Sequence, residues 1–465
     1  MTELEKLFSG IGDKLVRCDT ISGSGSNRQY TRLHGEKITA IGVYGKDVCE
    51  NKAFIALSRH FKEKGIKVPQ ILNVSEDFHY YITEDLGDTQ LFSLLSPDAQ
   101  PVELLEKCMQ ALPDIQYKAG ETLDYTLCYP QQEFDRHTVF WDLNYFKYEF
   151  LKPNGIEFDE LLLEQDFEHF AEILLAENTN TFMFRDFQSR NVMVKDGEPF
   201  FIDYQGGRRG PVYYDLASFV YQAKARFSEQ LKQHLIDTYI AAASKYTAIN
   251  PALFRERLEY FVLFRNLQTL GAYGFRGLVE HKAHFIQSIP FGIHNLKELL
   301  KAAKFEDLPY LTKVLNELVE NYQEPFVNNT HELVVKVYSF SYKKGIPMDY
   351  SGNGGGYVFD CRAVHNPGKY EQYKQKTGLD QDVIDFIEQN GEMAVFLEHV
   401  YALADAAVAR YLKRGFTDLM FSFGCTGGQH RSVYGAQHLA EHLNSKFGVK
   451  VVLEHRERGI ITILT

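Results

Sequence analysis

The sequence has no long apolar run, and its cysteines form no pattern. No uncharged apolar stretch approaches the ~18 residues that a membrane span needs, so we expect no membrane anchor. Residues 1–15 lack the basic and apolar regions of a signal peptide. The six cysteines include no CxxC pair, which excludes a CxxC zinc or redox centre. These absences predict a cytoplasmic protein in which most cysteines are reduced, small core residues.

Basic charge is also scarce. The net formal charge is −12, and residues 333–465 hold 15 Lys and Arg against 14 Asp and Glu. A protein that binds a nucleic-acid backbone normally presents a basic surface, so this balance argues against RNA binding. No GxxxxGK loop occurs, which excludes a P-loop ATPase. The sixteen histidines show no metal-ligand spacing, so we expect no histidine metal centre.

The stretch from Phe184 to Tyr204 is the most informative part of the chain. Asp186 is followed five positions later by Asn191, and Asp203 ends an apolar run. Residues 192–202 predict a β-hairpin with Asp196 and Gly197 as its turn. In phosphoryl transfer to a hydroxyl, one carboxylate accepts the proton, while an amide and a second carboxylate hold Mg²⁺. Asp and Asn also favour turns, but a chance match would rarely keep both the order and the hairpin.

This stretch resembles the aminoglycoside/choline phosphotransferase family, most of all its bacterial branch of cell-wall amino-sugar kinases. The motifs that match are Arg185-Asp186, Arg190-Asn191, Asp203-Tyr204-Gln205, Gly210-Pro211 and Tyr214-Asp215-Leu216. The resemblance implies an α+β, protein-kinase-like domain of two lobes that uses ATP and Mg²⁺ to phosphorylate an amino-sugar hydroxyl. It implies that Asp186 is the base, that Asn191 and Asp203 bind the metal, and that Asp215 and Arg190 brace the catalytic loop.

Two departures from the family pattern bear on activity. Phe184 stands where many relatives have His. The predicted strand 37–43 has no central lysine, where kinases place the one that binds the α- and β-phosphates, and Lys37 and Lys46 lie only at its edges. Glu50 fits the acidic role on the following helix, but its cationic partner is missing from the strand. A nucleotide-binding regulator without transferase activity therefore stays open as an alternative.

The rest of a small lobe can be followed upstream. Strands are predicted at 19–21, 30–33, 71–74 and 79–83, with a helix over 51–64 that ends at Gly65. The small, polar loop between the first two strands is predicted to cover the ATP phosphates through Ser22, Gly23, Ser24, Gly25, Ser26 and Asn27. Glu84 and Leu86 occupy the predicted hinge and its adenine contacts. The small lobe is expected over about 1–87.

The large lobe is expected over about 88–322 and is mostly helical. Apolar residues recur at three- and four-residue spacing in 104–112, 140–151, 161–175, 231–243 and 253–270. The aromatic segment 140–146 either walls a sugar site or belongs to an amphipathic core helix, and the second interpretation is favoured. A linker is predicted over 323–332, where the helical pattern breaks.

A second pattern lies near the C-terminus. A buried strand over 417–423 is followed by the loop 424–432 and a predicted helix over 433–444. Glycines allow close backbone approach, helix-terminal N–H groups bind anions, and His430 and Arg431 add donors. The segment from Cys425 to Arg431 also has the Cys-x5-Arg spacing of phosphatases, so a nucleophilic Cys425 is an alternative.

Residues 333–465 resemble the RapZ C-terminal domain, whose signature reads GCTGGxHRSV. The match extends, in order, over residues 339–347, 359–362, 366–367 and 377–379, so it is nearly domain-wide. The resemblance implies a smaller α/β domain that senses glucosamine-6-phosphate. The phosphate would be held by Cys425, Thr426, Gly427, Gly428, His430, Arg431 and Ser432, with Arg362 and Asn366 nearby. The family's RNA-binding members carry a basic tail, which this chain lacks.

The sequence therefore predicts a Mg-ATP-dependent small-molecule kinase fused to a sugar-phosphate-binding domain. The expected acceptor is an amino sugar of the N-acetylmuramate or N-acetylglucosamine type, and the expected effector is an amino-sugar phosphate. Two other hypotheses stay open. One is a nucleotide-binding regulator of amino-sugar metabolism, and the other is a phosphohydrolase that uses Cys425.

Overall fold

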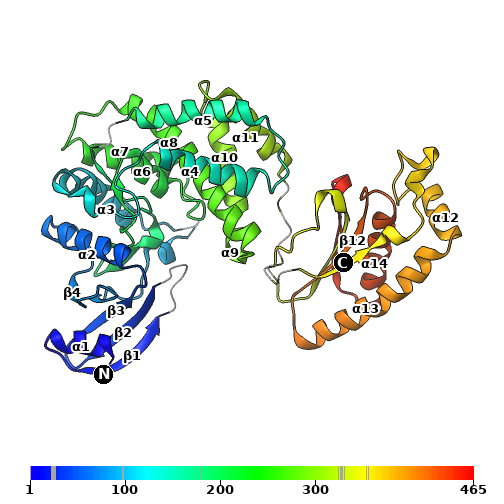
Figure 1. The fold of residues 1–465 in the computed structure, drawn as a ribbon, viewed down its shortest axis with the longest axis horizontal. Helices are drawn as coiled ribbons and strands as arrows, with labels where there is room; N and C mark the ends of the chain where they lie inside the picture. Colours follow the sequence, from blue (N-terminus) through cyan, green and yellow to red (C-terminus); the bar gives the residue numbers. More distant parts are fainter. Residues whose placement is uncertain are drawn as a thin grey trace. The chain divides into compact units, whose positions relative to one another are not determined.

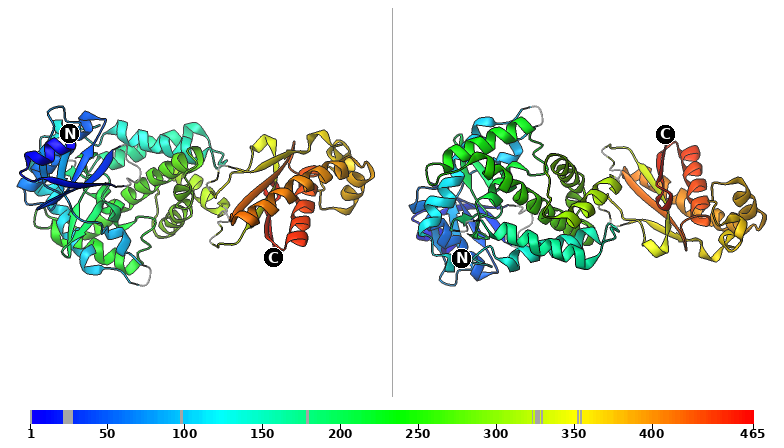
Figure 2. Two further views of the ribbon diagram at one scale, coloured as in Figure 1. Left: turned by 90° about the horizontal axis from the view of Figure 1, so that it is seen from below. Right: turned by 90° about the horizontal axis from the view of Figure 1, so that it is seen from above.

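A computed structural model describes residues 2–21, 28–96, 99–177, 180–322, 324, 328, 330–351, 353 and 355–465. Contacts divide the chain into two compact units. One unit holds Met1–Phe275 and Ser288–Tyr322, and the other holds Arg276–Gln287 and Gln323–Thr465. Figures 1 and 2 show the elements of each unit. None of the helices in the described ranges has the length and apolar character to cross a membrane.

The first unit opens with a five-stranded antiparallel sheet in the order β1-β2-β3-β5-β4. The strands are β1 Leu15–Ile21, β2 Gln29–Gly35, β3 Thr39–Tyr44, β4 Ile71–Val74 and β5 Tyr80–Glu84. Helix α2 (Val48–Glu63) starts at the N-cap Asp47 and buries Phe54 and Phe61, and it lies beside these strands in Figure 1. These elements confirm the predicted strands and helix. Helix α1 (Glu3–Gly10), which a capping box begins at Thr2, was not predicted.

The rest of this unit is mainly helical, as predicted. Its helices are α3 Val102–Pro113, α4 Arg136–Phe146, α5 Glu160–Leu175, α6 Tyr213–Val220, α7 Glu229–Ala243, α8 Pro251–Tyr273, α10 Ile289–Ala302 and α11 Pro309–Asn321. The segment Arg276–Gln287 carries α9 (Ala283–Ile286). Helix α3 packs on α7, while α4, α6 and α10 pack on α8, so α8 is the central helix of the bundle. Short 3₁₀ or π turns are η1 Leu91–Leu94, η2 Asp114–Ala119, η3 Gly120–Thr122, η4 Tyr125–Leu127, η5 Lys147–Leu151, η6 Ser189–Asn191 and η7 Gly274–Val279.

Two small antiparallel ladders frame the predicted catalytic segment. Strand β6 (Phe182–Met183) pairs with β9 (Arg208–Arg209), and β7 (Val192–Lys195) pairs with β8 (Glu198–Phe201). Asp196 and Gly197 close the β7–β8 hairpin with φ of 53° and 72°, which confirms the predicted turn. Residues 184–191, between the two ladders, carry Asp186 and Asn191.

The second unit contains a five-stranded sheet in the order β11-β12-β10-β13-β14. Strands β11 (Tyr357–Asp360), β12 (Asp418–Cys425), β10 (Val334–Ser341) and β13 (Lys450–His455) are parallel, and β14 (Ile460–Leu464) is antiparallel to β13. Helices α12 (Gln381–Gln389), α13 (Glu392–Arg414) and α14 (Arg431–Phe447) share its core (Figure 1). Short 3₁₀ turns are η8 Tyr342–Lys344, η9 Cys361–Ala363, η10 Pro367–Lys369, η11 Glu371–Tyr373 and η12 Arg456–Arg458. The strand, loop and helix predicted over 417–444 are confirmed as β12 and α14.

Candidate functional site

The predicted catalytic loop is fastened to helix α6 by Asp215. Its fully buried carboxylate accepts hydrogen bonds from the backbone N–H groups of Phe184 at 2.8 Å and Arg185 at 2.9 Å. Gln116 Nε2 donates a third bond at 3.1 Å. Burial raises the pKa of Asp215 to about 7, and the three donors act in the opposite direction. These contacts are those expected of a brace for the loop that carries Asp186.

A second brace comes from Arg185, a residue to which sequence reasoning gave no role. Arg185 has a φ of 79°, and its Nη2 donates to both carboxylate oxygens of Asp142, at 3.0 and 2.8 Å. Its guanidinium also lies 5.2 Å from the centre of the Tyr214 ring. Asp142 lies on α4, 43 residues earlier in the chain, and no local pattern pairs it with Arg185.

Arg190 is exposed, whereas the neighbouring Arg185 is the arginine that turns inward. The positive charge of Arg190 offsets part of the rise in the pKa of Asp203. That Arg190 braces the loop stays a prediction.

The three residues predicted to carry the chemistry lie in one place. Asn191 Nδ2 donates to the backbone oxygen of Asp186 at 2.8 Å, so the amide is tied to the base by its own loop. Desolvation in the cleft and then the negative charge of Asp186 raise the pKa of Asp203, although its carboxylate still meets solvent. Ile202, the residue before Asp203, donates its N–H to the backbone oxygen of Asn191 at 3.0 Å, so Asp203 lies next to the loop that carries Asp186 and Asn191.

The donor set at this place suits Mg²⁺. The amide nitrogen of Asn191 is engaged, which leaves its oxygen as the group that a cation would bind, and Asp203 adds a carboxylate. In the described part of the chain, no group of three or more His, Cys, Asp or Glu is placed to hold a metal. A kinase site needs no such group, since Mg²⁺ takes one or two protein oxygens and completes its shell with water and nucleotide phosphates.

Arg265, on the central helix α8, lies beside Asp186. Its Nη2 is 3.5 Å from Asp186 Oδ1, and its Nε donates to Ser218 Oγ at 3.1 Å. Nη1 donates to Thr269 Oγ1 at 3.0 Å, so the guanidinium is held from several sides and is 8% exposed. In the sequence, Arg265 is one polar residue in an amphipathic helix, and nothing there links it to the catalytic loop.

On the small-lobe side, the predicted phosphate loop Ser22–Asn27 lies outside the described residues. Arg28, which follows it, places Nη2 3.2 Å from Glu50 Oε1 on α2. Gln205 Nε2 donates one hydrogen bond to Glu50 Oε1 at 3.3 Å and another to Asp203 Oδ1 at 2.8 Å. Sequence reasoning left Glu50 without a cationic partner, and the structure supplies Arg28, the residue before β2, in place of a residue of β3.

The hinge residues lie where β5 leaves the small lobe. Glu84, the last residue of β5, accepts a hydrogen bond from Lys195 Nζ at 2.8 Å, and Leu86 is buried. Arg32 on β2 donates to the Asp85 carboxylate at 2.8 Å, which fixes the sheet to the hinge. Glu84 and Leu86 stay predicted ATP contacts.

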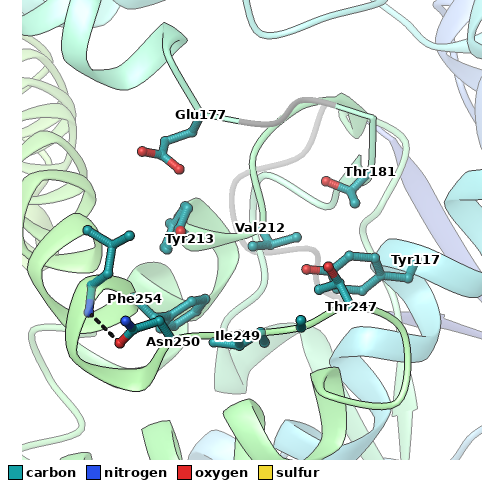
Figure 3. A pocket seen from close by; sticks show the side chains of 11 residues that line it. Tyr117, Glu177, Thr181, Val212, Tyr213, Thr247, Ile249, Asn250 and Phe254 are labelled. Atoms are coloured by element: carbon teal, nitrogen blue, oxygen red, sulfur yellow. Dashed lines mark hydrogen bonds between the residues drawn. The ribbon is translucent and has the colours of Figure 1, made fainter.

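The aromatic segment on α4 is mainly a core element. Val139, Leu143 and Phe146 are fully buried, whereas Trp141 is 65% exposed. A cavity of about 220 Å³ lies elsewhere in the large lobe, and Figure 3 shows Tyr117, Glu177, Tyr213 and Phe254 around it. No residue predicted for catalysis, metal binding or nucleotide binding lines this cavity, so it is separate from the cleft at Asp186.

In the second unit, the glycine loop joins β12 to α14 as predicted. Cys425 Sγ accepts a hydrogen bond from Gly428 N–H at 3.2 Å and lies 3.1 Å from Ser432 Oγ. Burial acts to raise the pKa of Cys425, but the hydrogen bonds from Ser432 and from loop N–H groups, with the charge of Arg431, lower it overall. Thr426 and Gly427 are exposed at the tip of the loop.

The side chains of Arg431 and His430 contact backbone carbonyl oxygens of neighbouring segments. Arg431 Nη1 donates to the carbonyl oxygens of Arg362 at 3.1 Å and Val364 at 2.8 Å. His430 Nε2 lies 2.9 Å from the carbonyl oxygen of Tyr373. The structure thus brings the segment after β11 against the glycine loop, which places the predicted residues Arg362 and Asn366 in its neighbourhood.

Arg362 and Asn366 themselves make local contacts. The Arg362 side chain is half exposed, pairs with Asp360 at 2.6 Å, and lies 4.1 Å from the centre of the Tyr342 ring. Asn366 Oδ1 accepts the N–H of Gly368 at 3.2 Å. Both therefore stay predicted sugar-phosphate contacts whose side chains are held by neighbours close in sequence.

Two family models match this chain. The model of the phosphotransferase enzyme family matches residues 20–255, and that of the RapZ C-terminal domain matches residues 333–459. A nucleotide-binding protein of Staphylococcus aureus (strain bovine RF122 / ET3-1) is 30% identical over 234 residues, which are 50% of this chain and 74% of that protein. One of Thermosipho africanus (strain TCF52B) is 32% identical over 175 residues, 37% of this chain. The alignment with the latter spans only 60% of its length.

Solved kinase structures are also similar to the N-terminal part. A choline kinase from Cryptosporidium parvum Iowa II is 14% identical and covers 65% of this chain and 94% of its own, with a TM-score of 0.45. A choline/ethanolamine kinase family protein from Mesorhizobium loti is 15% identical and covers 65% of this chain and 93% of its own, with a TM-score of 0.43.

Proposed function

Because this chain belongs to the phosphotransferase enzyme family over residues 20–255 and carries a RapZ C-terminal domain over residues 333–459, we propose that it is a Mg-ATP-dependent amino-sugar kinase with a sugar-phosphate-binding domain. The observation that supports the kinase most is that Asn191 is bonded to the backbone of Asp186, while Ile202, next to Asp203, is bonded to the backbone of Asn191. The proposed proton acceptor and the two proposed oxygen ligands are therefore neighbours.

Each residue has a proposed task in transfer to the hydroxyl. Asp186 orients the acceptor hydroxyl and takes its proton, and the guanidinium of Arg265 keeps that carboxylate in place. Asn191 and Asp203 would hold Mg²⁺, which supplies positive charge against the phosphates when it is bound. Ser22–Asn27 would cover the phosphates, and the hinge at Glu84 and Leu86 would contact adenine.

An amino sugar is the proposed acceptor because the N-terminal and the C-terminal domain both resemble proteins that bind amino sugars or their phosphates. The catalytic motifs resemble those of amino-sugar kinases, and the C-terminal domain resembles a sensor of glucosamine-6-phosphate. The effector phosphate is proposed to lie on the loop 425–432, at the N-terminus of α14, where backbone N–H groups favour an anion. The C-terminal domain would then report on a product or a downstream metabolite of the same class.

The geometry of the glycine loop favours binding over phosphate hydrolysis. Arg431 Nη1 donates to two backbone carbonyl groups, which holds the segment after β11 against the loop. A Cβ atom at Gly424 would lie 2.5 Å from ring atoms of Phe340 and Tyr342, so a larger residue, such as the histidine of those phosphatases, does not fit there. Cys425 is buried and bonded to its own loop.

The experiment that tests the kinase is ADP release by the purified full chain with Mg-ATP. The acceptors would be N-acetylmuramate, N-acetylglucosamine, glucosamine, choline and an aminoglycoside. We expect turnover on an amino sugar and a loss of at least ~10²–10⁴-fold in Asp186→Asn, the usual range for a general base. Asp237→Asn, on the exposed side of α7, is the matched control and should be as active as wild type.

Silence with every acceptor, combined with stabilisation by ATP, would favour the nucleotide-binding regulator. Turnover that is unchanged in Asp186→Asn would show that the base has been assigned to the wrong residue. Turnover on choline or the aminoglycoside alone would keep the kinase and reject the amino sugar.

A further inference from the structure

Strand β3 lacks the basic residue that kinases of this general type use to hold the α- and β-phosphates of ATP. The strand reads Thr-Ala-Ile-Gly-Val-Tyr and contains no cation. Lys37 and Lys46, which lie just outside its ends, are both exposed. A phosphate-binding cation of the small lobe must therefore come from another element.

Arg28 directly precedes β2 and is the buried cation of this region. It is 7% exposed, and its guanidinium lies 5.6 Å from the centre of the Phe54 ring on α2. Its Nη2 is 3.2 Å from Glu50 Oε1, and it also bonds the Tyr30 hydroxyl. A charged side chain is rarely buried in this way without a partner or a ligand that requires it.

The contacts of Glu50 connect Arg28 to the proposed metal ligand. The Gln205 amide donates to Glu50 Oε1 at 3.3 Å and to Asp203 Oδ1 at 2.8 Å. Arg28 is thus linked to Asp203 through Glu50 and Gln205.

Arg32, the next arginine on β2, has a different task. Its guanidinium donates to Asp85 at 2.8 Å and to Asp88 at 2.8 Å, and so it ties β2 to the hinge. Of these two arginines, only Arg28 is next in sequence to the predicted phosphate loop and paired with the helix-borne carboxylate.

We infer that Arg28 is the residue that binds the α- and β-phosphates of the nucleotide, with Glu50 as the residue that orients it. This inference rests on the proposed kinase function and names a phosphate contact that comes from the residue before β2. A guanidinium suits the position, because its planar fork of five N–H donors holds a carboxylate on one edge and phosphate oxygens on another. The lobe can then use ATP although β3 has no lysine.

The test compares the binding of ADP and of adenosine, each with Mg²⁺, by the full chain. Adenosine reports on the hinge alone, whereas ADP also needs the phosphate contact. For Arg28→Met we expect the Kd for ADP to rise about 10- to 100-fold, the range for hydrogen bonds to charged groups, while the Kd for adenosine stays within about threefold. Arg28→Lys keeps the charge and should lose less.

Arg17→Met is the matched control, since Arg17 lies on β1 with an exposed side chain paired to Asp19. It should bind ADP as wild type does. Should Arg28→Met fail to melt cooperatively, the same comparison is made with Glu50→Gln, which removes the orienting carboxylate and should weaken ADP binding by about 3- to 10-fold without weakening adenosine.

Equal weakening of ADP and adenosine would overturn the inference, because Arg28 would then only support the shape of the lobe. An unchanged Kd for ADP in the variants would overturn it as well. Failure of the proposed function looks different: wild type would bind ADP and lose affinity in Arg28→Met, yet phosphorylate no acceptor.

Discussion

The buried pair of Arg185 and Asp142 gives a prediction whose size follows from the structure. Two bonds of 3.0 and 2.8 Å join the guanidinium to both carboxylate oxygens, and the two side chains are 16% and 5% exposed. Asp142→Leu would leave the Arg185 charge buried without its carboxylate. Breaking one side of such a pair costs about 3–5 kcal/mol of unfolding free energy.

Asp142→Leu is also expected to lower kcat. Arg185 directly precedes Asp186, and its own N–H is held by Asp215, so loss of Asp142 removes one of two fixed points of the loop. A displacement of the base by about 1 Å is enough to lower kcat roughly 10²-fold. Stability and kcat should therefore fall together in Asp142→Leu.

A double-mutant cycle measured by urea denaturation is the assay. The variants are Asp142→Leu, Arg185→Met and the combination, with kcat recorded for each. Because the combined variant buries no unpaired charge, it should be more stable than Asp142→Leu alone by at least about 1 kcal/mol. Additive losses, or a loss below about 1 kcal/mol in Asp142→Leu, would refute the view that this pair fixes the loop.

Other predictions concern the metal, the base, the glycine loop and a buried histidine. Asp203→Asn should raise the Mg²⁺ concentration needed for half-maximal activity by about 10- to 100-fold in a metal titration. Arg265→Met should lower kcat more than it raises the KM for ATP, and equal effects on both would contradict its place beside Asp186. Cys425→Ser should keep sugar-phosphate binding within about tenfold by calorimetry, and a phosphatase activity that this change abolished would reject the binding assignment. Burial lowers the pKa of His455 to about 4, so the folded state disfavours the protonated imidazole. The contribution of neutral His455 to the free energy of unfolding should be fully present above pH 6.5 and fall by about 3 kcal/mol as the pH decreases to 4. His455→Gln should remove this pH dependence in denaturation curves.

The parts of the fold that sequence reasoning predicted are those with a local signal. The hairpin turn was predicted because an Asp-Gly pair, here Asp196 and Gly197, tolerates the positive φ that a type I′ turn requires at both positions. Both residues have positive φ in the structure. The strand and helix around the glycine loop followed from a buried apolar run and a helical period. Helix α1 was not predicted, because its capping box at Thr2 and Glu5 was not recognised as a helix start.

The parts of the site that sequence reasoning missed depend on pairs distant along the chain. Arg185 pairs with Asp142 on α4, and Arg265 on α8 lies beside Asp186. Glu50 pairs with Arg28 and not with a lysine of β3, the strand that usually supplies the partner in kinases. Long-range pairs of this kind leave no spacing in the sequence, so only the tertiary arrangement identifies them.

The catalytic loop is built into the hydrophobic core of its lobe. Phe184 and Phe187, on either side of Asp186, are each 1% exposed, and their rings lie 5.2 Å apart. Phe187 continues to Phe201 at 5.3 Å and to Phe219 at 5.3 Å. Because the chain is packed in this way on both sides of Asp186, we expect the loop to unfold together with the core of the lobe. Loss of turnover during denaturation should coincide with global unfolding of the lobe, so enzymatic activity itself would serve as a reporter of the folded fraction.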